Sequence, residues 1–327
     1  MASPKRSARI AKRSPSSPYS TVQSQQLGAA TRSSSAAGSV SRRKEEKKRG
    51  EGRSEGFHVA ATEPHSLEGI PTGSGASHQD PIRIPCRESP NDSGCVYCPI
   101  GVELCDCVEF KEIIWGKLLA VDNKRRVCGK KAQNSKSILP PFVTRLVRLL
   151  GIDASDVFWD LGSGHGSVVM QVACQTGATA IGVELQQENA DLANAVWPAV
   201  KREWERRHPD RKAGHVVFIG GDMFPTLAAA IDGSLAGISP PTVAWAANLV
   251  FPPMLNHHLR EALLTVPSLK AVGVQLDIYP HSRESARKRD PRPFEKFPRM
   301  IYHEWQEGSV EWSETEVKVF CTYTSRK

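Results

Sequence analysis

Blocks of apolar residues recur at regular intervals from residue 157 onward. Residues 157–161 and 180–184 are apolar runs of strand length, and residues 168–175 between them have helical spacing. The further elements that this alternation predicts are strands at residues 215–222, 242–248 and 271–279 and helices at residues 187–208 and 253–264. Strands that alternate with helices predict an α/β fold with a doubly wound, mostly parallel sheet.

The pattern also predicts how this sheet begins and ends. A helix over residues 140–150 begins at two prolines and ends before a glycine, and a shorter helix is expected over residues 108–119. Two candidate strands at residues 309–312 and 316–324 would close the sheet as a hairpin. Pro198 lies inside the predicted helix 187–208, so we expect a kink or a break there.

Charge and composition divide the 327-residue chain into parts. The formal net charge is +8, and residues 1–56 hold 13 Lys and Arg against 4 Glu, so the rest of the chain is close to neutral. These residues are rich in Ser, Ala and Gly and cannot bury enough apolar surface to offset chain entropy. We expect a disordered basic tail over residues 1–80, a small cysteine-containing segment of loops and helices over residues 81–150, with order beginning near Pro85, and the main α/β domain over residues 151–327.

Two basic clusters in the tail, Lys5–Arg13 and Arg42–Arg49, suit contact with a polyanion or nuclear import. Contact with nucleic acid through such clusters would be independent of base sequence and sensitive to salt. The alternative is a tail that serves only solubility. The sequence shows neither the apolar core of a signal peptide nor an unbroken apolar run of about 18 residues, so we expect an intracellular protein outside the membrane.

Five of the eight cysteines lie in a short stretch ahead of the main domain. Cys95 and Cys98 form a C-x-x-C, and Cys105 and Cys107 form a C-x-C. Four thiolates so close together can hold a tetrahedral zinc ion, although a second C-x-x-C is missing. The alternative is a set of reduced thiols in a loosely packed segment.

The first predicted strand runs into a glycine-rich turn whose spacing suits a bound cofactor. Gly162, Gly164 and Gly166 allow a sharp turn and the close approach of a ligand to bare backbone. Asp160 ends the strand, where an open parallel sheet presents ligand-binding groups, and Glu184 ends the next strand. A carboxylate at the first position can hold an ammonium group, and one at the second can accept two ribose hydroxyls. This combination predicts a site for S-adenosylmethionine.

A dinucleotide site is the main alternative. Its glycine pattern requires Gly or Ala three positions after the second glycine, whereas this chain has Ser167 there. A second alternative is a purely structural strand-to-helix turn, because glycine patterns also arise by chance. The agreement of strand, turn, helix and distant acid favours cofactor binding over both.

Two later strand ends carry further candidate residues. Asp222 ends the third predicted strand, where its carboxylate can accept a hydrogen bond from the adenine amine, and Met223 and Phe224 offer apolar surface to the ring. Asp222 can instead serve only as a helix N-cap. Asn248 ends the fourth strand and is followed by Phe251, and we expect both to line the place where the methyl donor meets its acceptor.

With these motifs, the chain resembles the Dot-one (disruptor of telomeric silencing) family of histone H3 lysine methyltransferases. The resemblance covers roughly residues 135–327, and its motifs are DLGSGHGSVVMQVA at 160–173, GVE at 182–184, GDMF at 221–224, NLVFPPMLNHHL at 248–259 and GSVEW at 308–312. It implies a class I S-adenosylmethionine-dependent methyltransferase with a seven-stranded sheet. It also implies a nuclear chromatin enzyme that methylates a lysine in the globular core of histone H3 on nucleosomes.

The resemblance further implies roles for single residues. The positions that match cofactor contacts are Asp160, Gly162, Gly164, Glu184 and Asp222. Asn248 matches the polar residue near the target lysine, and Trp312 matches the tryptophan that helps to wall the lysine channel. As an alternative, Trp312 packs within the sheet, because large aromatic residues are commonly buried.

Some positions depart from the family pattern. Residues 135–137 read SKS where the family usually has Tyr-Gly-Glu, so cofactor contacts from that loop are not carried over. His165 and Ser167 replace commoner Val and Gln in the glycine turn, and Val319 occupies a position that often holds a channel Tyr. These changes leave open how many methyl groups are transferred.

An in-line methyl transfer needs no enzymic nucleophile, but it needs a neutral amine. Because a free lysine has a pKa of about 10.4, we expect an apolar channel formed by Phe251 and Trp312 to favour the neutral form by desolvation, with Asn248 orienting the amine. Two other functions stay open from the sequence. They are methylation of a nucleic acid or another protein, and catalytically silent binding of cofactor or chromatin.

Overall fold

The computed structural model describes residues 73–83, 107–118, 138–279, 284–305 and 319–325. All of them lie in the second of two compact units, which spans residues 60–327. Several sequence predictions fall outside the described residues, and these concern residues 1–72 of the tail, Cys95, Cys98, Cys105 and Trp312.

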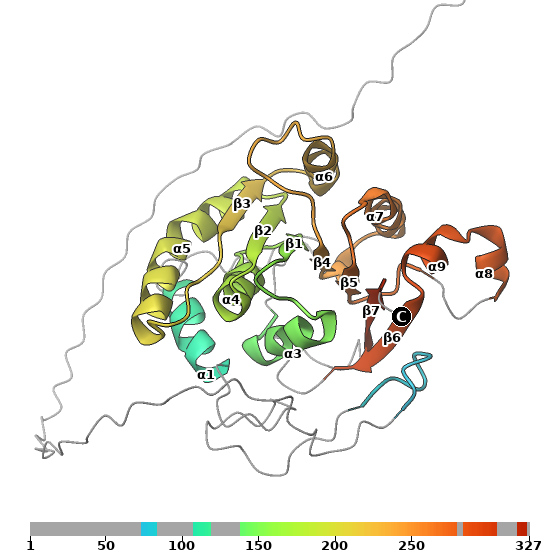
Figure 1. Cartoon of the computed structure of the whole chain (residues 1–327), viewed down its shortest axis with the longest axis horizontal. Coiled ribbons are helices and arrows are strands. Elements are labelled where there is room, and N and C mark those ends of the chain that lie inside the picture. Colours follow the sequence, from blue (N-terminus) through green and yellow to red (C-terminus); the bar gives the residue numbers. More distant parts are fainter. Residues whose placement is uncertain (1–72, 84–106, 119–137, 280–283, 306–318, 326–327) are drawn as a thin grey trace, which may run out of the picture. The chain divides into compact units, whose positions relative to one another are not determined.

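Seven strands form one sheet in the order β3-β2-β1-β4-β5-β7-β6 (Figure 1). Their bounds are β1 Val157–Leu161, β2 Thr179–Glu184, β3 Val216–Gly220, β4 Val243–Ala246, β5 Ala271–Val274, β6 Arg299–Glu304 and β7 Val319–Thr324. Strands β1 to β5 pair in parallel, and β7 runs antiparallel to both β5 and β6. The strand order turns back between β1 and β4, which is where such sheets bind ligands. The predicted doubly wound, mostly parallel sheet is confirmed.

Helices cover both faces of this sheet. Their bounds are α1 Cys107–Phe110, the π-helix η1 Lys111–Trp115, α3 Pro140–Leu150, α4 Ser167–Thr176, α5 Gln187–Arg207, α6 Met223–Ile231, the 3-10 helix η3 Asn248–Val250, α7 Pro253–Thr265, α8 Glu284–Arg289 and α9 Arg292–Lys296. In Figure 1, α3, α4 and α5 lie on one side of the sheet and α6 and α7 on the other. The neighbouring β1 residues Phe158 and Trp159 belong to the two opposite cores, as the pleat of a strand requires. Within the described ranges, no helix has the length and apolar character needed to cross a membrane.

Two helices test local predictions. Helix α3 ends where expected, because Gly151 adopts a left-handed φ of 60° directly after it. Helix α5 runs without interruption from Gln187 to Arg207, so of the kink or break expected at Pro198, the break is wrong. The buried Val200 and Trp204 hold the second half of α5 on the core. The stabilisation from this packing outweighs the loss of the backbone hydrogen bond that proline cannot donate.

The carboxyl-terminal part of the sheet differs from the prediction. The candidate strand at residues 309–312 lies outside the described residues, and the strand that pairs with β7 is β6, which the sequence pattern did not predict. The β6 sequence, RMIYHE, carries polar residues at both ends and gives a weak strand signal. Strand β6 pairs with β7 along its whole length, so tertiary pairing determines its conformation.

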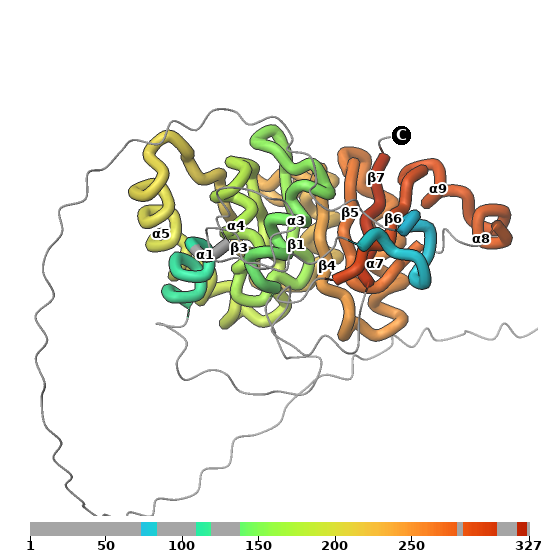
Figure 2. The backbone as a smooth tube through the Cα atoms, turned by 90° about the horizontal axis from the view of Figure 1, so that it is seen from below, coloured from blue at the N-terminus to red at the C-terminus, as the bar shows by residue number. Residues whose placement is uncertain are grey.

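Residues 73–83, which we name the strap, lie beside β6 (Figures 1 and 2). The Ile82 N–H donates to the Tyr302 carbonyl at 2.8 Å, and the Glu304 N–H donates to the Ile82 carbonyl at 2.9 Å. These bonds satisfy backbone groups that an edge strand otherwise leaves open. The sequence analysis placed residues up to 80 in a disordered tail and expected order to begin near Pro85. This expectation is therefore wrong for the strap.

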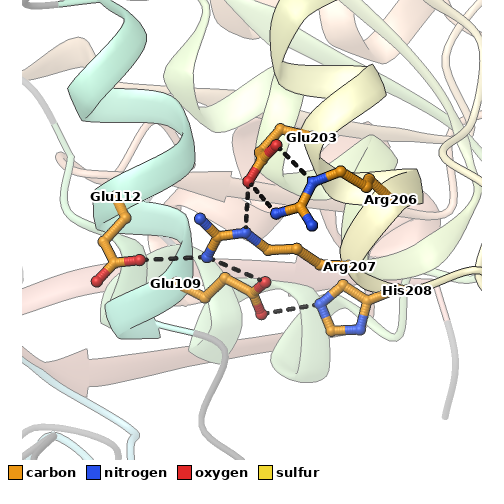
Figure 3. A network of polar contacts seen from close by, with 6 residues as sticks. All are labelled: Glu109, Glu112, Glu203, Arg206, Arg207 and His208. Atoms are coloured by element: carbon orange, nitrogen blue, oxygen red, sulfur yellow. Dashed lines mark hydrogen bonds and ion pairs between the residues drawn. The ribbon is translucent and has the colours of Figure 1, made fainter. Parts of the chain in front are cut away.

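Polar contacts join α1 and η1 to the end of α5, and Figure 3 shows their members: Glu109, Glu112, Glu203, Arg206, Arg207 and His208. Arg207 donates to Glu112 at 3.2 Å and to Glu203 at 2.8 Å, and a His208 ring nitrogen lies 2.8 Å from a Glu109 carboxylate oxygen. Phe110 stacks on Trp204 with ring centroids 4.9 Å apart. The helices before residue 150 thus share one core with α5, and the boundary expected there does not separate two cores.

Candidate functional site

The turn after β1 is hydrogen-bonded to the end of β2. The N–H groups of Gly162 and Ser163 both donate to the Val183 carbonyl, at 2.9 and 3.1 Å. Gly162, Gly164 and Gly166 have φ values of 95°, 54° and 77°, in the left-handed region that favours glycine. The turn therefore brings the ends of β1 and β2 together at the carboxyl edge of the sheet.

Two of these glycines lie against aromatic rings, and at Gly166 the contact is too close for a β-carbon. A Cβ atom on Gly166 would lie 2.3 Å from Cε1 of Phe218, a buried residue of β3. A Cβ atom on Gly162 would lie 3.4 Å from Cζ of Phe251, which follows η3. The bare backbone at Gly162 therefore faces an aromatic ring from the neighbouring β4 side of the site.

Asp160 is buried near the end of β1, with 2% of its surface exposed. Its Oδ1 atom has no hydrogen-bond partner among the described residues. Burial first, and then the charge of Glu184, raise the pKa of Asp160 to about 8. Because a buried carboxylate is costly to ionise without a nearby cation, this position suits the ammonium group of a ligand.

Glu184 faces the glycine turn from the end of β2. One carboxylate oxygen accepts a hydrogen bond from the Gly164 N–H at 2.8 Å, and the other accepts one from the Gln186 N–H at 3.0 Å. Each oxygen retains a further lone pair, so the carboxylate is still able to accept hydroxyl groups. Glu184 thus joins the turn to β2 and still has free lone pairs to accept hydrogen bonds from ribose hydroxyls.

Four features test whether S-adenosylmethionine suits these residues. The unpaired Asp160 oxygen matches a ligand ammonium, and Glu184 matches a pair of ribose hydroxyls. The Ser163 Oγ is buried and, within the described part of the chain, also lacks a partner. The glycines between these groups have positive φ, so the turn takes a conformation that residues with a β-carbon rarely adopt. The residues present fit the cofactor.

Asp222 is the N-cap of α6, as the alternative interpretation predicted. Its Oδ1 accepts a hydrogen bond from the Phe224 N–H at 2.9 Å, and the residue is exposed. Capping uses one carboxylate oxygen, so it is compatible with a contact from the second oxygen to an adenine amine. Met223 and Phe224 are half-buried beside it, and Phe224 packs edge-on against His258 of α7.

Asn248 is fully buried after β4, and its side chain is bonded to other parts of the protein. Its Nδ2 donates to the Asn256 side chain at 2.7 Å and to the Leu276 carbonyl at 3.0 Å. Its Oδ1 accepts a hydrogen bond from the Leu276 N–H at 2.9 Å. Both amide donors are in use, so the geometry favours a positioning role for Asn248 over direct contact with a substrate.

Two polar residues of this region were missed by sequence reasoning. Asn256 donates from Nδ2 to the Phe251 carbonyl at 3.2 Å. Gln275 accepts a hydrogen bond from the Leu249 N–H at 3.3 Å, and its buried Nε2 lacks a partner among the described residues. Gln275 directly follows β5, which was a usable signal, whereas nothing in the helical pattern of α7 distinguishes Asn256.

The apolar wall of the acceptor side is described in part. Phe251 is half-buried, and the neighbouring Val250 and Met254 are exposed large apolar residues. Trp312 lies outside the described residues, so its channel role stays a prediction. Val319 begins β7 and is buried.

The zinc site also stays a prediction. Cys95, Cys98 and Cys105 lie outside the described residues, and Cys107 begins α1. Within the described ranges, no group of three His, Cys, Asp or Glu residues is placed to hold a metal ion.

Comparison with known proteins identifies the family. The family model "Histone methylation protein DOT1" matches residues 136–324. An H3 lysine-79-specific histone-lysine N-methyltransferase of Dictyostelium discoideum is 26% identical over 188 residues, which cover 57% of this chain and 10% of that protein. A protein of the same description from Chaetomium globosum is 26% identical over 178 residues, covering 54% of this chain and 32% of that protein. The matched region thus spans a third or less of these relatives.

Among solved structures, an RNA methyltransferase from Salinibacter ruber in complex with S-adenosyl-L-homocysteine matches at 22% identity with a TM-score of 0.36, covering 57% of this chain and 92% of that chain. At this TM-score, the likeness carries no weight for function. The family model covers more than half of the chain, including the glycine turn, Glu184 and Asn248. The chain therefore belongs to the DOT1 family of histone methylation proteins.

Proposed function

We propose that this chain is an S-adenosylmethionine-dependent histone-lysine N-methyltransferase that acts on histone H3 in nucleosomes. The observation that carries the cofactor part is the buried Asp160 oxygen beside the glycine turn, which has no partner in the described part of the chain. The substrate part rests on the family, because the two relatives above are described as specific for H3 lysine 79. We extend that target, a lysine in the globular core of H3, to this chain.

The cofactor half of the site works through charge and bare backbone. Asp160 binds the ammonium group and becomes ionised, because a nearby cation lowers the pKa that burial raised. Glu184 accepts the ribose hydroxyls while it keeps its bond to the turn. Asp222 accepts from the adenine amine with the oxygen that does not cap α6, and Met223 covers the ring. When bound, S-adenosylmethionine supplies a methyl group already activated on a positively charged sulfur.

The acceptor half must present a neutral amine, although a lysine in water has a pKa of about 10.4. The Phe251 ring near Gly162 excludes water and desolvates the incoming amine, which lowers the pKa of that amine. Trp312 is the second wall in this proposal. Asn248 acts as a positioning residue, since Asn256 links it to the Phe251 carbonyl.

Methyl transfer from tritium-labelled S-adenosylmethionine to reconstituted nucleosomes, followed by peptide mapping, tests this function. We expect label on a lysine of the H3 core, with transfer lost in Asp160→Asn. Transfer should be retained in Asp232→Asn, a matched change at an exposed aspartate after α6. Label on free RNA or DNA but not on histones would assign the chain to nucleic-acid methylation instead. Cofactor binding without any transfer would identify a catalytically silent protein.

We also propose that the basic tail holds the enzyme on nucleosomal DNA and supports a nuclear location. Residues 1–56 hold 13 Lys and Arg against 4 Glu, and such a charge favours the release of counterions from DNA. Removal of residues 1–56 should weaken nucleosome binding and flatten its dependence on salt, while the affinity for cofactor stays the same. Unchanged nucleosome binding would contradict the tether, and exclusion of the tagged full-length chain from nuclei would contradict the location.

A further inference from the structure

The strap lies outside the residues that match the family model, yet it packs closely on the sheet. The Tyr302 N–H donates to the Gly75 carbonyl at 2.8 Å, in addition to the bonds that Ile82 makes with β6. A Cβ atom on Gly75 would lie 2.6 Å from Cγ2 of Ile301, which shows how close the strap backbone lies to β6. The strap therefore brings His78 to a defined place beside β6.

His78 meets two side chains of the main domain there. Its Nε2 lies 3.7 Å from Oδ1 of Asp277, and its ring centroid lies 4.5 Å from that of Tyr302. The Tyr302 hydroxyl donates to Oδ2 of Asp277 at 3.1 Å. The strap, the segment after β5 and strand β6 thus converge on one carboxylate.

The residue that carries this carboxylate is next in the chain to a residue bonded by Asn248 of the acceptor half. Asp277 directly follows Leu276, whose N–H and carbonyl are both bonded by the Asn248 side chain. Consecutive Cα atoms are about 3.8 Å apart, so Asp277 is anchored next to the residue that Asn248 holds. Strands β4 and β5 are parallel neighbours, and the carboxyl ends of such strands share the ligand-binding edge of a sheet.

The two oxygens of Asp277 have different surroundings. Oδ2 is held by Tyr302, and burial first, then the charge of Asp277, raise the pKa of that hydroxyl, so the hydroxyl stays a donor. Oδ1 faces His78 at a distance longer than a hydrogen bond, and the Asp277 side chain is 36% exposed. Arg83 of the strap pairs with Glu304 instead. Asp277 therefore offers a fixed anionic oxygen to a cation that arrives from solvent.

We propose that Asp277 is a substrate-docking residue that binds the ammonium group of the target lysine as the lysine enters, with Tyr302 and His78 as positioning residues. This inference rests on the proposed function, because a lysine reaches the enzyme in its protonated form. The carboxylate attracts that charge before the apolar wall removes water from the amine. A partly exposed ion pair of this kind changes affinity by up to about fivefold.

Binding to two nucleosomes tests the docking role directly. One nucleosome carries the lysine identified by methyl transfer, and the other carries methionine in its place. The wild-type full-length chain should bind the lysine nucleosome about fivefold more tightly, and Asp277→Asn should bind both equally. For the lysine nucleosome, the KM of Asp277→Asn should rise by the same factor while kcat is unchanged. Asp232→Asn should keep the wild-type preference.

Tyr302→Phe gives an independent test, because it keeps the ring and removes the hydroxyl that orients Oδ2. It should lose part of the preference for lysine over methionine, which a purely structural role would leave intact. If Asp277→Asn and Tyr302→Phe both keep the full preference, the docking role is overturned and the cluster serves only to hold the strap. The two proposals fail separately. If the chain methylates an H3 lysine but its preference for the lysine nucleosome does not depend on Asp277, only the docking role is refuted. If the wild-type chain methylates no histone lysine, the proposed function is refuted as well.

Discussion

Asp160 and Asn248 are both buried polar residues at the carboxyl edge of the sheet, but their hydrogen bonding differs. An oxygen of Asp160 has no partner in the described part of the chain, and burial raises the pKa of Asp160 to about 8. Asn248 uses both amide donors and its oxygen on Asn256 and Leu276. The end of β1 thus lacks a group that a ligand supplies, whereas Asn248 is satisfied by the protein itself.

This contrast separates binding residues from positioning residues. An unpaired buried acceptor reduces the stability of the free protein, so its presence at the carboxyl edge of the sheet indicates a ligand. A saturated buried amide stabilises the fold and positions its neighbours. Changes at β1 and β2 should therefore alter ligand affinity, and changes after β4 should alter stability and turnover.

The largest expected effect is the loss of cofactor affinity in Asp160→Asn. Removal of the charge that pairs with the ammonium should cost about 3 kcal/mol, roughly a hundredfold in affinity.

The folded-state pKa of about 8 lies above the ordinary value of 3.8, so the free wild-type protein loses stability as the pH rises from about 4 to 8. Asp160→Asn removes this loss and should unfold at a higher temperature than wild type at pH 9. Calorimetric titration measures the cofactor affinity, and thermal unfolding measures the Tm. If Asp160→Asn keeps full affinity and has a lower Tm than wild type at pH 9, the role of Asp160 in binding the ammonium group is contradicted.

A pair of glycines sharpens the same comparison for the backbone. Gly166 and Gly233 both have a φ of 77°, but a Cβ atom on Gly233 meets nothing within 4 Å among the described residues, whereas one on Gly166 would lie 2.3 Å from Phe218. Both alanine variants should lose about 1–2 kcal/mol to backbone strain. Gly166→Ala should lose a further 1–3 kcal/mol, roughly, through overpacking. Denaturant unfolding measures the difference, and equal losses would show that the turn relaxes around a β-carbon.

Asn248→Ala tests the acceptor side. It leaves the Leu276 peptide groups and the Asn256 side chain without their partner, so the free energy of unfolding should fall by about 1–3 kcal/mol. Turnover should fall with it through displacement of Phe251, while cofactor affinity stays within about twofold. Asn256→Ala is the matched control, because it keeps the bonds to Leu276 and should reduce turnover with a smaller loss of stability. Full stability of Asn248→Ala with abolished turnover would indicate direct contact with the lysine.

A further expected effect is a dependence of cofactor affinity on pH. Because the pKa of Asp160 in the free protein is about 8, binding of an ammonium group below that pH must release the proton of Asp160. The affinity for S-adenosylhomocysteine should therefore rise between pH 6 and 8 by less than about tenfold per pH unit. Asp160→Asn should show no such rise, and a flat wild-type profile would mean that Asp160 is already ionised in the free protein.

Sequence patterns predicted the parallel part of the sheet and the groups at its ends. Strands β1 and β2 are mainly apolar and carry Asp160 and Glu184 at their carboxyl ends, and the structure brings both carboxylates to the glycine turn. The patterns failed for β6 and the strap, because neither is apolar enough to be recognised without its pairing partner. They also allowed a break at Pro198, where burial of the same helix outweighs a local signal.

By itself, the sequence determined the alternation of strands and helices, the glycine turn and the acidic strand ends. These features depend on local spacing and on the conformational freedom of single residues, which a linear pattern records. Only the tertiary structure decided that Asn248 is bonded to Leu276, that an Asp160 oxygen has no partner among the described residues, and that His78 meets Asp277. Such contacts join residues far apart in the chain, so they depend on how strands pair and helices pack, and no local pattern contains that information.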